Sequence, residues 1–254
     1  MAEQKEQTLK LYNNPVCPFG ERAWATITVK NIPHEFVHCD INNKSDEFKE
    51  AYSKALGHDD NNAGKVPIIK TVDGKYITES AVVARYLDYV YSDEDKYGPP
   101  LLPKEPFERA AVESMIDWFG DSGWIRLHYG ILFEDDKAAA EKKAAEWKTK
   151  WKILNERLGQ FSQKGTYLGG DRVSLFEVHV IGFFERLVTI EHFHGYDILN
   201  GWMKEYPRIQ SWWNTVKEIE GFKKTMQSRQ FLVDAYTISR NKRIEARKSA
   251  AKSN

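Results

Sequence analysis

Hydrophobic and polar residues alternate with two different periods along the first ninety residues of this chain. Short runs in which every second residue is apolar predict β-strands, and stretches with apolar residues three or four positions apart predict helices. In order, the predicted elements are strand Thr8–Asn13, helix Cys17–Lys30, strand Glu35–Ile41, helix Ser45–Leu56, strands Val66–Val72 and Lys75–Thr78, and helix Glu79–Tyr91. The dipeptide Asp73-Gly74 between the last two strands is a strong hairpin signal. The pattern predicts an α/β domain over residues 1–91.

The order βαβαββα is that of a thioredoxin-like domain, and the hydrophobic pattern changes after it. Residues 92–106 are charged and rich in proline, which predicts a linker. Residues 107–238 are predicted to form an all-α domain, and residues 239–254 a basic tail that is disordered or a frayed helix. The predicted helices of the second domain are Phe107–Tyr129, Asp136–Phe161, Ser174–Ile190 and Tyr206–Thr225.

Two local features of the second half are interpreted as structural. Ser174-Leu175-Phe176-Glu177 matches a capping box, which predicts a helix start and no catalytic role. The tail could contact RNA, an acidic protein surface or a membrane, but a solvated basic tail is the favoured interpretation.

Composition narrows the classes of protein that this chain could belong to. Lys and Arg together number 37, as do Asp and Glu, so net charge does not point to nucleic acid. Two cysteines provide no disulfide framework, which favours a reducing compartment. The first residues are polar, no apolar run is long enough to cross a membrane, and the histidines lack metal-ligand spacing. We expect a cytoplasmic protein with no nucleic-acid partner, no membrane span and no metal.

Cys17 is the residue whose position in the sequence indicates a reactive side chain. It stands between the first predicted strand and the first predicted helix, so it lies at a helix N-terminus, where free N–H groups and the dipole favour negative charge. Such positions lower a thiol pKa from about 8.5 to between roughly 3.5 and 7.5, and the thiolate is the reactive form. Pro18 is compatible with a first helical turn because the N–H it lacks would have no helical partner there. We favour a reactive thiol over a buried structural cysteine.

The second cysteine is not placed to cooperate with the first. Gly20 occupies the position at which a C-x-x-C motif would have its resolving cysteine. Alternation along the second strand places Cys39 on the same face as Val37 and Ile41, which predicts a core position. Redox chemistry at Cys17 is therefore predicted to use a single thiol.

Three motifs occur in a telling order: Cys17-Pro18-Phe19 with Arg22 opens the first helix, Lys65-Val66-Pro67 begins a hairpin strand, and Glu79-Ser80 begins the third helix. Together with the helical second half, this set resembles the cysteine-type cytosolic glutathione transferases, namely the omega and plant lambda classes. The resemblance extends from about Thr8 to Thr237. It implies a thioredoxin-like N-terminal domain, an all-helical C-terminal domain and glutathione as co-substrate.

The resemblance also implies roles for individual residues in a glutathione site that includes Phe19. The peptide before Pro67 is expected to be cis, so that the backbone of Val66 faces the cysteinyl part of glutathione. At the γ-glutamyl end, Glu79 takes the ammonium and Ser80 the carboxylate, at a helix N-terminus suited to anions.

The glycyl end of the predicted site is less defined. Lys44 resembles the residue that contacts the glycyl carboxylate, and Lys65 is the alternative. The loop between Leu56 and Lys65, with Asp59 and Asp60, is longer and more acidic than the class leads us to expect. It could weaken glutathione binding or favour a more cationic thiol. Without Cys17, these features would be interpreted as a turn, a helix cap and solvated lysines.

A second-substrate site is predicted between the domains. Aromatic and histidine side chains gather on the first helix of the second half, and they would suit flat or apolar electrophiles. The same spacing is also typical of a helix core. The residues assigned to this site are Trp118, Trp124, His128 and Tyr129.

The predicted activity is that of a glutathione-dependent thiol transferase and reductase. Cys17 would form a mixed disulfide with glutathione, in the removal of glutathione from small-molecule or protein mixed disulfides or in dehydroascorbate-type reduction. The alternatives are a conjugating glutathione transferase and a non-enzymatic interaction protein of the same fold, similar to intracellular chloride-channel-type proteins or to a translation-factor subunit. The resemblance also implies a two-fold homodimer.

Overall fold

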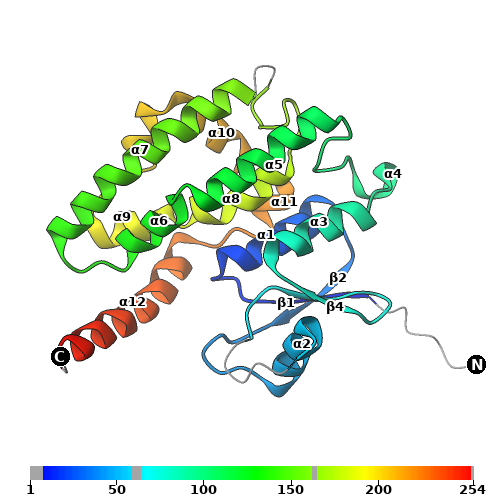
Figure 1. The fold of residues 1–254 in the computed structure, drawn as a ribbon, viewed down its shortest axis with the longest axis horizontal. Coiled ribbons are helices and arrows are strands. Elements are labelled where there is room, and N and C mark those ends of the chain that lie inside the picture. The colour runs from blue at the N-terminus through cyan, green and yellow to red at the C-terminus, as the bar shows by residue number, and fades with distance from the viewer. Residues whose placement is uncertain (1–7, 59–63, 162–164, 253–254) are drawn as a thin grey trace, which may run out of the picture. The chain divides into compact units, whose positions relative to one another are not determined.

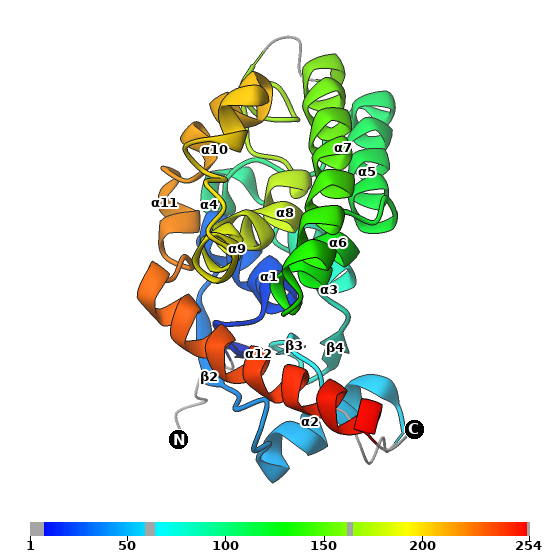
Figure 2. The same cartoon turned by 90° about the vertical axis from the view of Figure 1, so that its left-hand side faces the viewer.

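The computed structural model describes residues 8–58, 64–161 and 165–252. The chain forms two compact units (Figures 1 and 2). The first comprises the residues up to Leu102 together with Ile219–Thr225, and the second comprises Pro103–Glu218 and the residues from Met226 onward. Among the described residues, none of the helices combines the length and the apolar character that crossing a membrane requires.

The first unit contains a four-stranded mixed sheet whose strand order is β2-β1-β3-β4. Strand β1 pairs in parallel with β2 and antiparallel with β3, and β3 pairs antiparallel with β4. The predicted order βαβαββα is confirmed. The elements are β1 Leu9–Asn13, α1 Pro18–Val29, β2 His34–His38, α2 Asp46–Leu56, β3 Ile68–Lys70, β4 Tyr76–Thr78 and α3 Ser80–Val90.

Alternation along the strands sends side chains to two separate cores. Leu9 and Leu11 of β1 pack with residues of α1 and α3, such as Ile27 and Leu87, on one face of the sheet. Tyr12 lies in a second cluster, with residues of α2, on the other face. Helices α1 and α3 therefore cover one face and α2 covers the other (Figure 1). The thioredoxin-like prediction follows from this two-period pattern, and the structure confirms it.

Cys39 belongs to the second cluster, as the sequence predicts, and only 5% of it is exposed. Burial raises the pKa of the Cys39 thiol to about 12. The strand itself is shorter than predicted, since β2 ends at His38 and Ile41 is exposed. Cys39 is thus an inert core residue.

The predicted linker is largely folded onto the first unit. It contains the short helix α4 Glu94–Tyr97 and continues to buried Leu101 and Leu102. The Asp88 carboxylate of α3 accepts hydrogen bonds from the backbone N–H groups of Leu101 and Leu102 at 2.8 and 3.0 Å. Lys30 forms a buried ion pair with the same carboxylate at 3.1 Å. Because of these contacts, the first unit extends to Leu102, beyond the predicted domain end at residue 91.

A late segment of the chain returns to the first unit. Helix α11, Glu220–Lys223, packs against α1, and Thr225 donates a hydrogen bond to buried Glu21 at 3.3 Å. A Cβ on Gly221 would lie 2.7 Å from the Cα of Val29, so glycine permits this close approach. The sequence placed residues 219–225 in the helical domain, because helical periodicity does not reveal which core a short helix joins.

The second unit is all helical, with more breaks than the sequence predicts. The predicted helix over 107–129 is two helices that meet at Gly123, whose φ of +83° favours glycine. The predicted helix over 174–190 is likewise broken, at Arg186. The elements are α5 Pro106–Asp121, α6 Trp124–Leu132, α7 Lys137–Phe161, α8 Leu175–Glu185, α9 Leu187–His194, the 3₁₀ helix η1 Trp202–Glu205, α10 Pro207–Val216 and α12 Arg229–Lys252.

The capping box at the start of α8 is confirmed and has a second task. Ser174 accepts from the backbone N–H of Phe176 at 3.2 Å, and the Glu177 carboxylate accepts from the backbone N–H of Ser174 at 2.8 Å. The same carboxylate accepts from the indole N–H of Trp212 at 3.0 Å. The box thus ties the N-terminus of α8 to α10 in the core of the second unit.

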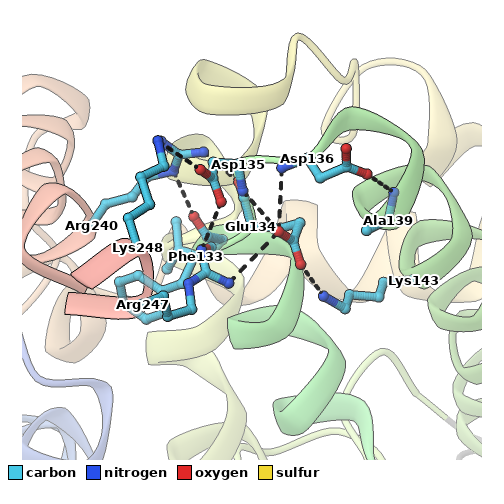
Figure 3. A network of polar contacts seen from close by, with 10 residues as sticks. Phe133, Glu134, Asp135, Asp136, Ala139, Lys143, Arg240, Arg247 and Lys248 are labelled. Atoms are coloured by element: carbon cyan, nitrogen blue, oxygen red, sulfur yellow. Dashed lines mark hydrogen bonds and ion pairs between the residues drawn. The ribbon is translucent and has the colours of Figure 1, made fainter. Parts of the chain in front are cut away.

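The basic tail differs from the sequence prediction, because it belongs to helix α12. Figure 3 shows Arg240, Arg247 and Lys248 pointing toward the corner between α6 and α7. Arg240 donates to the carbonyls of Leu132, at 3.0 Å, and Glu134, while Arg247 donates to the carbonyl of Phe133. Carbonyls at the C-terminus of α6 have no helical N–H partner, so these arginines satisfy them.

Acidic side chains at the same corner complete the contact. Asp135 lies 3.0 Å from Arg247 and 3.2 Å from Lys248 (Figure 3). Lys143, together with backbone N–H groups, holds the pKa of Glu134 at about 2. A basic segment that would be solvated alone is therefore ordered by acceptors from a distant part of the chain.

Candidate active site

Cys17 lies at the point where β1 passes into α1. The chain turns after Asn13, and the Cys17 N–H donates to the carbonyl of Asn14 at 3.0 Å. Cys17 is a half-buried residue and the N-cap of α1, and its Sγ accepts from the backbone N–H of Gly20 at 3.5 Å. Pro18 occupies the first helical position. The structure therefore places the thiol sulfur where an N-cap acceptor belongs, facing the positive end of the helix dipole.

Two asparagines that were not among the predicted site residues, Asn13 and Asn14, border this turn. Asn14 donates to the carbonyl of Cys39 at 2.8 Å and accepts from the N–H of Val16 at 2.9 Å. Asn13 is fully buried against α1, and a Cβ on Gly20 would lie 1.8 Å from its Oδ1. Glycine is therefore required at position 20, because the side-chain amide of Asn13 leaves no room for a Cβ. In a C-x-x-C motif, the same position would hold the resolving cysteine. The only sequence signal for the role of these two residues was the preference of asparagine for turns.

The Val66–Pro67 peptide is cis, as the resemblance implies. Tyr12 of β1 pairs with Ile68 of β3, so this peptide lies beside the end of β1 from which the chain enters the Cys17 turn. The Pro67 carbonyl accepts from the hydroxyl of Thr78 at 3.1 Å. The sheet register therefore brings the first two sequence motifs to the same edge.

The two candidate lysines differ in their surroundings. Lys44 is half-buried, and its side chain lies against Gly64, since a Cβ there would be 3.3 Å from the Lys44 Cδ. Lys65 is exposed. The loop residues Asp59 and Asp60 lie outside the described residues.

The third motif starts α3. Glu79 has a positive φ of +70°, which is uncommon for a residue with a side chain and is often found at functional positions. Its side chain is exposed and makes no capping hydrogen bond to the helix. Ser80, by contrast, is buried. The Arg22 guanidinium of α1 donates to the Ser80 hydroxyl at 3.3 Å, which links the first and third motifs.

The predicted second-substrate residues divide into two groups. Trp124 and His128 are fully buried in the core of the second unit, where their rings stack on each other with centroids 5.5 Å apart. Burial lowers the pKa of His128 to about 3, with a smaller contribution from the positive charge of Arg186. These two assignments are corrected, because side chains on the inward face of α6 are taken up by core packing.

The other two residues of that set are partly accessible. Trp118 is half-buried beneath the guanidinium of Arg157, which lies 5.1 Å from the ring centroid. Tyr129 is half-buried and stacks on Phe133 with centroids 5.9 Å apart. Within the described ranges, no group of three or more His, Cys, Asp or Glu side chains is arranged to hold a metal ion.

Comparison with known families agrees with this geometry. The model of the glutathione S-transferase N-terminal domain matches residues 11–95, and that of the C-terminal domain matches residues 112–220. The chain belongs to the glutathione S-transferase family. Glutathione S-transferase omega-1 of the pig, Sus scrofa, is 25% identical over 207 residues, which cover 82% of this chain and 76% of that protein.

Solved structures of the family share the fold. A Tau class glutathione S-transferase from the mango Mangifera indica superposes with a TM-score of 0.78 at 20% identity, covering 92% of this chain and 99% of that one. Rice GST1, solved in complex with glutathione, superposes with a TM-score of 0.75 at 20% identity and covers 94% and 98%. The two-domain glutathione transferase architecture predicted from the sequence is therefore established.

Proposed function

We propose that this protein is a glutathione-dependent thiol transferase in which Cys17 is the nucleophile. The observation that carries the proposal is the position of the Cys17 sulfur at the N-cap of α1, within reach of the Gly20 N–H. An N–H donor and the helix dipole both favour the thiolate over the thiol. Cys39 is buried, so the second thiol does not compete.

The reaction proceeds by two thiol–disulfide exchanges. In the first, the Cys17 thiolate attacks the glutathionyl sulfur of a mixed disulfide. The Cys17–glutathione disulfide forms, and the substrate sulfur leaves as a thiolate. In the second, the thiolate of another glutathione attacks the glutathionyl sulfur, which releases oxidised glutathione and restores the Cys17 thiolate. Dehydroascorbate-type reduction would pass through the same enzyme-bound disulfide.

The described residues support a glutathione site around Cys17 and Phe19. The cis Val66–Pro67 peptide lies beside the end of β1, which favours backbone contacts with the cysteinyl part. The N-terminus of α3, with Glu79 and Ser80, favours the γ-glutamyl end. Of the two lysines, half-buried Lys44 is favoured over exposed Lys65 for the glycyl carboxylate. The half-buried side chain is already partly ordered, so it loses less conformational entropy when it binds the carboxylate.

The remaining parts of the proposal concern the second substrate and the partners. Trp118 and Tyr129 are the accessible aromatic residues of the predicted second-substrate set, for a small-molecule or protein mixed disulfide. The two free thiols fit a reducing, cytoplasmic setting. A homodimer is favoured by α3, on which Val82 and Tyr89 are 52% and 83% exposed.

The proposal is tested by replacing each cysteine. Incubation of the wild type with oxidised glutathione should add one glutathione, mapped to Cys17 and removed by reduced glutathione. The Cys17→Ser variant should lose both the adduct and the reduction of the mixed disulfide of glutathione and cysteine. Cys39→Ala is the matched control and should keep both. Full activity of Cys17→Ser would exclude the mechanism.

The pH dependence of alkylation separates a reactive Cys17 from a structural one. Iodoacetamide labelling of Cys17 should reach its plateau by about pH 6–7, as for other thiols at helix N-termini. Cys39 should label slowly because its side chain is buried and its pKa is about 12. A labelling midpoint for Cys17 near pH 8.5 would contradict activation by the helix.

A further inference from the structure

Asn13 is a fully buried polar residue beside the start of the thiol-bearing helix. It is the last residue of β1, and its backbone is anchored there because its carbonyl accepts from the N–H of Cys39 at 2.8 Å. Within residues 8–58, 64–161 and 165–252, neither Oδ1 nor Nδ2 of its carboxamide has a hydrogen-bond partner. An unpaired buried amide lowers the stability of a protein, so its presence indicates a role other than stability.

The carboxamide of Asn13 packs against the first turn of α1 at Gly20. A Cβ on Gly20 would lie 1.8 Å from Oδ1, 2.9 Å from Cγ and 3.3 Å from Nδ2 of Asn13, and these are its three nearest atoms. The severe contacts of a side chain at position 20 would therefore all be with Asn13. An oxygen approaches a Cα to about 3.3–3.6 Å, closer than the usual approach of two carbons. An amide thus lets the helix pack closer to the strand than an aliphatic side chain of similar shape would.

Gly20 is also the residue whose backbone N–H reaches the thiol. This N–H donates to the Cys17 Sγ at 3.5 Å. A hydrogen bond to the charged form of a group favours that form, and the bond weakens with distance and misalignment. The position of Gly20 therefore affects the fraction of Cys17 that is thiolate at a given pH.

We infer that Asn13 is a positioning residue for Cys17, acting through Gly20. Its carboxamide determines how closely the first turn of α1 packs on the end of β1, and so determines the distance from the Gly20 N–H to the sulfur. This inference rests on the proposed function, since it concerns the activation of the same thiol. Asn13 itself takes no part in the exchange at Cys17.

The test measures the pH midpoint of iodoacetamide labelling at Cys17 on the full chain, with the labelled cysteine identified by mass spectrometry. Asn13→Ala removes the carboxamide that supports Gly20. The midpoint should rise by about one pH unit, the usual effect of losing a hydrogen bond to a charged group. Gly20→Ala should raise the midpoint by a similar amount, because the added Cβ displaces the first turn from Asn13.

Combining the two substitutions tests whether Asn13 acts through Gly20. Asn13→Ala removes all three atoms that the added Cβ would meet, and this Cβ fills part of the space that they leave. The midpoint of the double variant should therefore be closer to that of the wild type than the midpoint of either single variant. Two shifts that simply add would show that the residues act independently, and would overturn the inference.

Gly120→Ala in α5 is the matched control for replacing a helical glycine, because its Cβ would have no neighbour within 4 Å. It should leave the labelling midpoint at the wild-type value. Titratable residues of α1 and of the cluster against which Cys17 packs are unchanged in all of these variants, so their effects on the midpoint cancel. They are Glu21 and Arg22 of α1, and Tyr12, Cys39 and Tyr52 of the cluster.

The outcomes separate this inference from the proposed function. A wild-type midpoint at about pH 6–7 that Asn13→Ala leaves unchanged would overturn the role of Asn13 and leave a reactive Cys17 intact. A wild-type midpoint near pH 8.5 would overturn both. A merely structural Asn13 would change the urea concentration at which the protein unfolds without moving the labelling midpoint.

Variants that fail to fold still give a decision. If Gly20→Ala does not fold, the double variant decides, since a folded protein with a midpoint near that of the wild type supports the inference and an unfolded one contradicts it. If Asn13→Ala does not fold, Asn13→Ser replaces it, because the serine hydroxyl ends one atom short of the Oδ1 position. A raised midpoint in Asn13→Ser supports the inference, and an unchanged one contradicts it.

Discussion

At the scale of single residues, the two cysteines show how environment separates two identical side chains. Cys17 caps a helix and accepts an N–H bond, whereas Cys39 packs between β1 and α2, where burial raises its pKa to about 12. A helix N-terminus favours a charged group, whereas burial disfavours one. The reactivity that we propose for Cys17 therefore depends on its position within the first unit, since both residues carry the same thiol.

His128 provides a prediction at the same scale. It is held neutral in the core because burial, and then the charge of Arg186, lower its pKa from 6.5 to about 3. The unfolded chain binds a proton at this side chain below pH 6.5, whereas the folded chain does not until about pH 3. Its contribution to stability is therefore complete above pH 6.5 and decreases as the pH falls, by about 2 kcal/mol at pH 5.

The measurement is urea unfolding at pH 7 and pH 5, for the wild type and for His128→Leu. The leucine variant has no titration at this position, so the stability of the wild type relative to it should fall by about 2 kcal/mol between the two pH values. The acidic groups titrate in both proteins and cancel in the comparison. An equal difference at the two pH values would show that His128 is protonated in the folded state.

At the scale of elements, the breaks between helices follow from single backbone positions. The turn at Gly123 separates α5 from α6, and the chain later leaves the helical unit so that α11 can pack against α1. The break at Gly123 depends on a residue with a left-handed backbone conformation, and the packing of α11 depends on a close approach between two helix backbones. Hydrophobic periodicity does not indicate either feature.

The contact between α11 and α1 gives a prediction about stability. An added Cβ at Gly221 would lie 2.7 Å from the Cα of Val29 and 2.9 Å from its backbone nitrogen, atoms that cannot rotate away. Gly221→Ala should destabilise the protein by about 2 kcal/mol through overpacking. Gly120→Ala in α5 is the control, because that Cβ would have no neighbour within 4 Å and should stabilise by about 0.5–1 kcal/mol. If urea unfolding gives Gly221→Ala the stability of wild type, the segment does not pack on α1.

At the scale of the whole molecule, the outer face of α3 is the surface that we propose for self-association. The structure exposes Val82 and Val90 at 52% and 48%, next to Tyr89 at 83%. Val83 and Leu87 take the inward positions on this helix. Contiguous exposed apolar surface is a feature of many protein contact sites, and this face of α3 supports the proposed dimer on that ground.

We expect light scattering at micromolar concentration to give about twice the chain mass of 29.5 kDa. Tyr89→Glu should shift the mass toward that of one chain, because a charge would be buried without a partner at the interface. Ile238→Glu in α12, at a position 59% exposed, is the control and should leave the mass unchanged. A wild-type mass near 29.5 kDa would contradict the dimer.

The sequence by itself determined the order of elements in the first unit and the position of Cys17 at the start of α1. Both follow from local physics, since side-chain period selects strand or helix and the residues around a helix start determine its cap. The capping box at Ser174 was predictable for the same reason, and the resemblance to a known family supplied the cis Val66–Pro67 peptide.

Tertiary structure decided the features that join distant positions. Arg22 reaches Ser80 58 positions away, and Arg240 reaches Leu132 108 positions away, which orders a tail that looks solvated in isolation. Trp124 and His128 became core because helix packing, and not spacing, determines which aromatic face is buried. A hydrogen bond or a buried face requires a partner, and local pattern does not specify which distant residue that partner is.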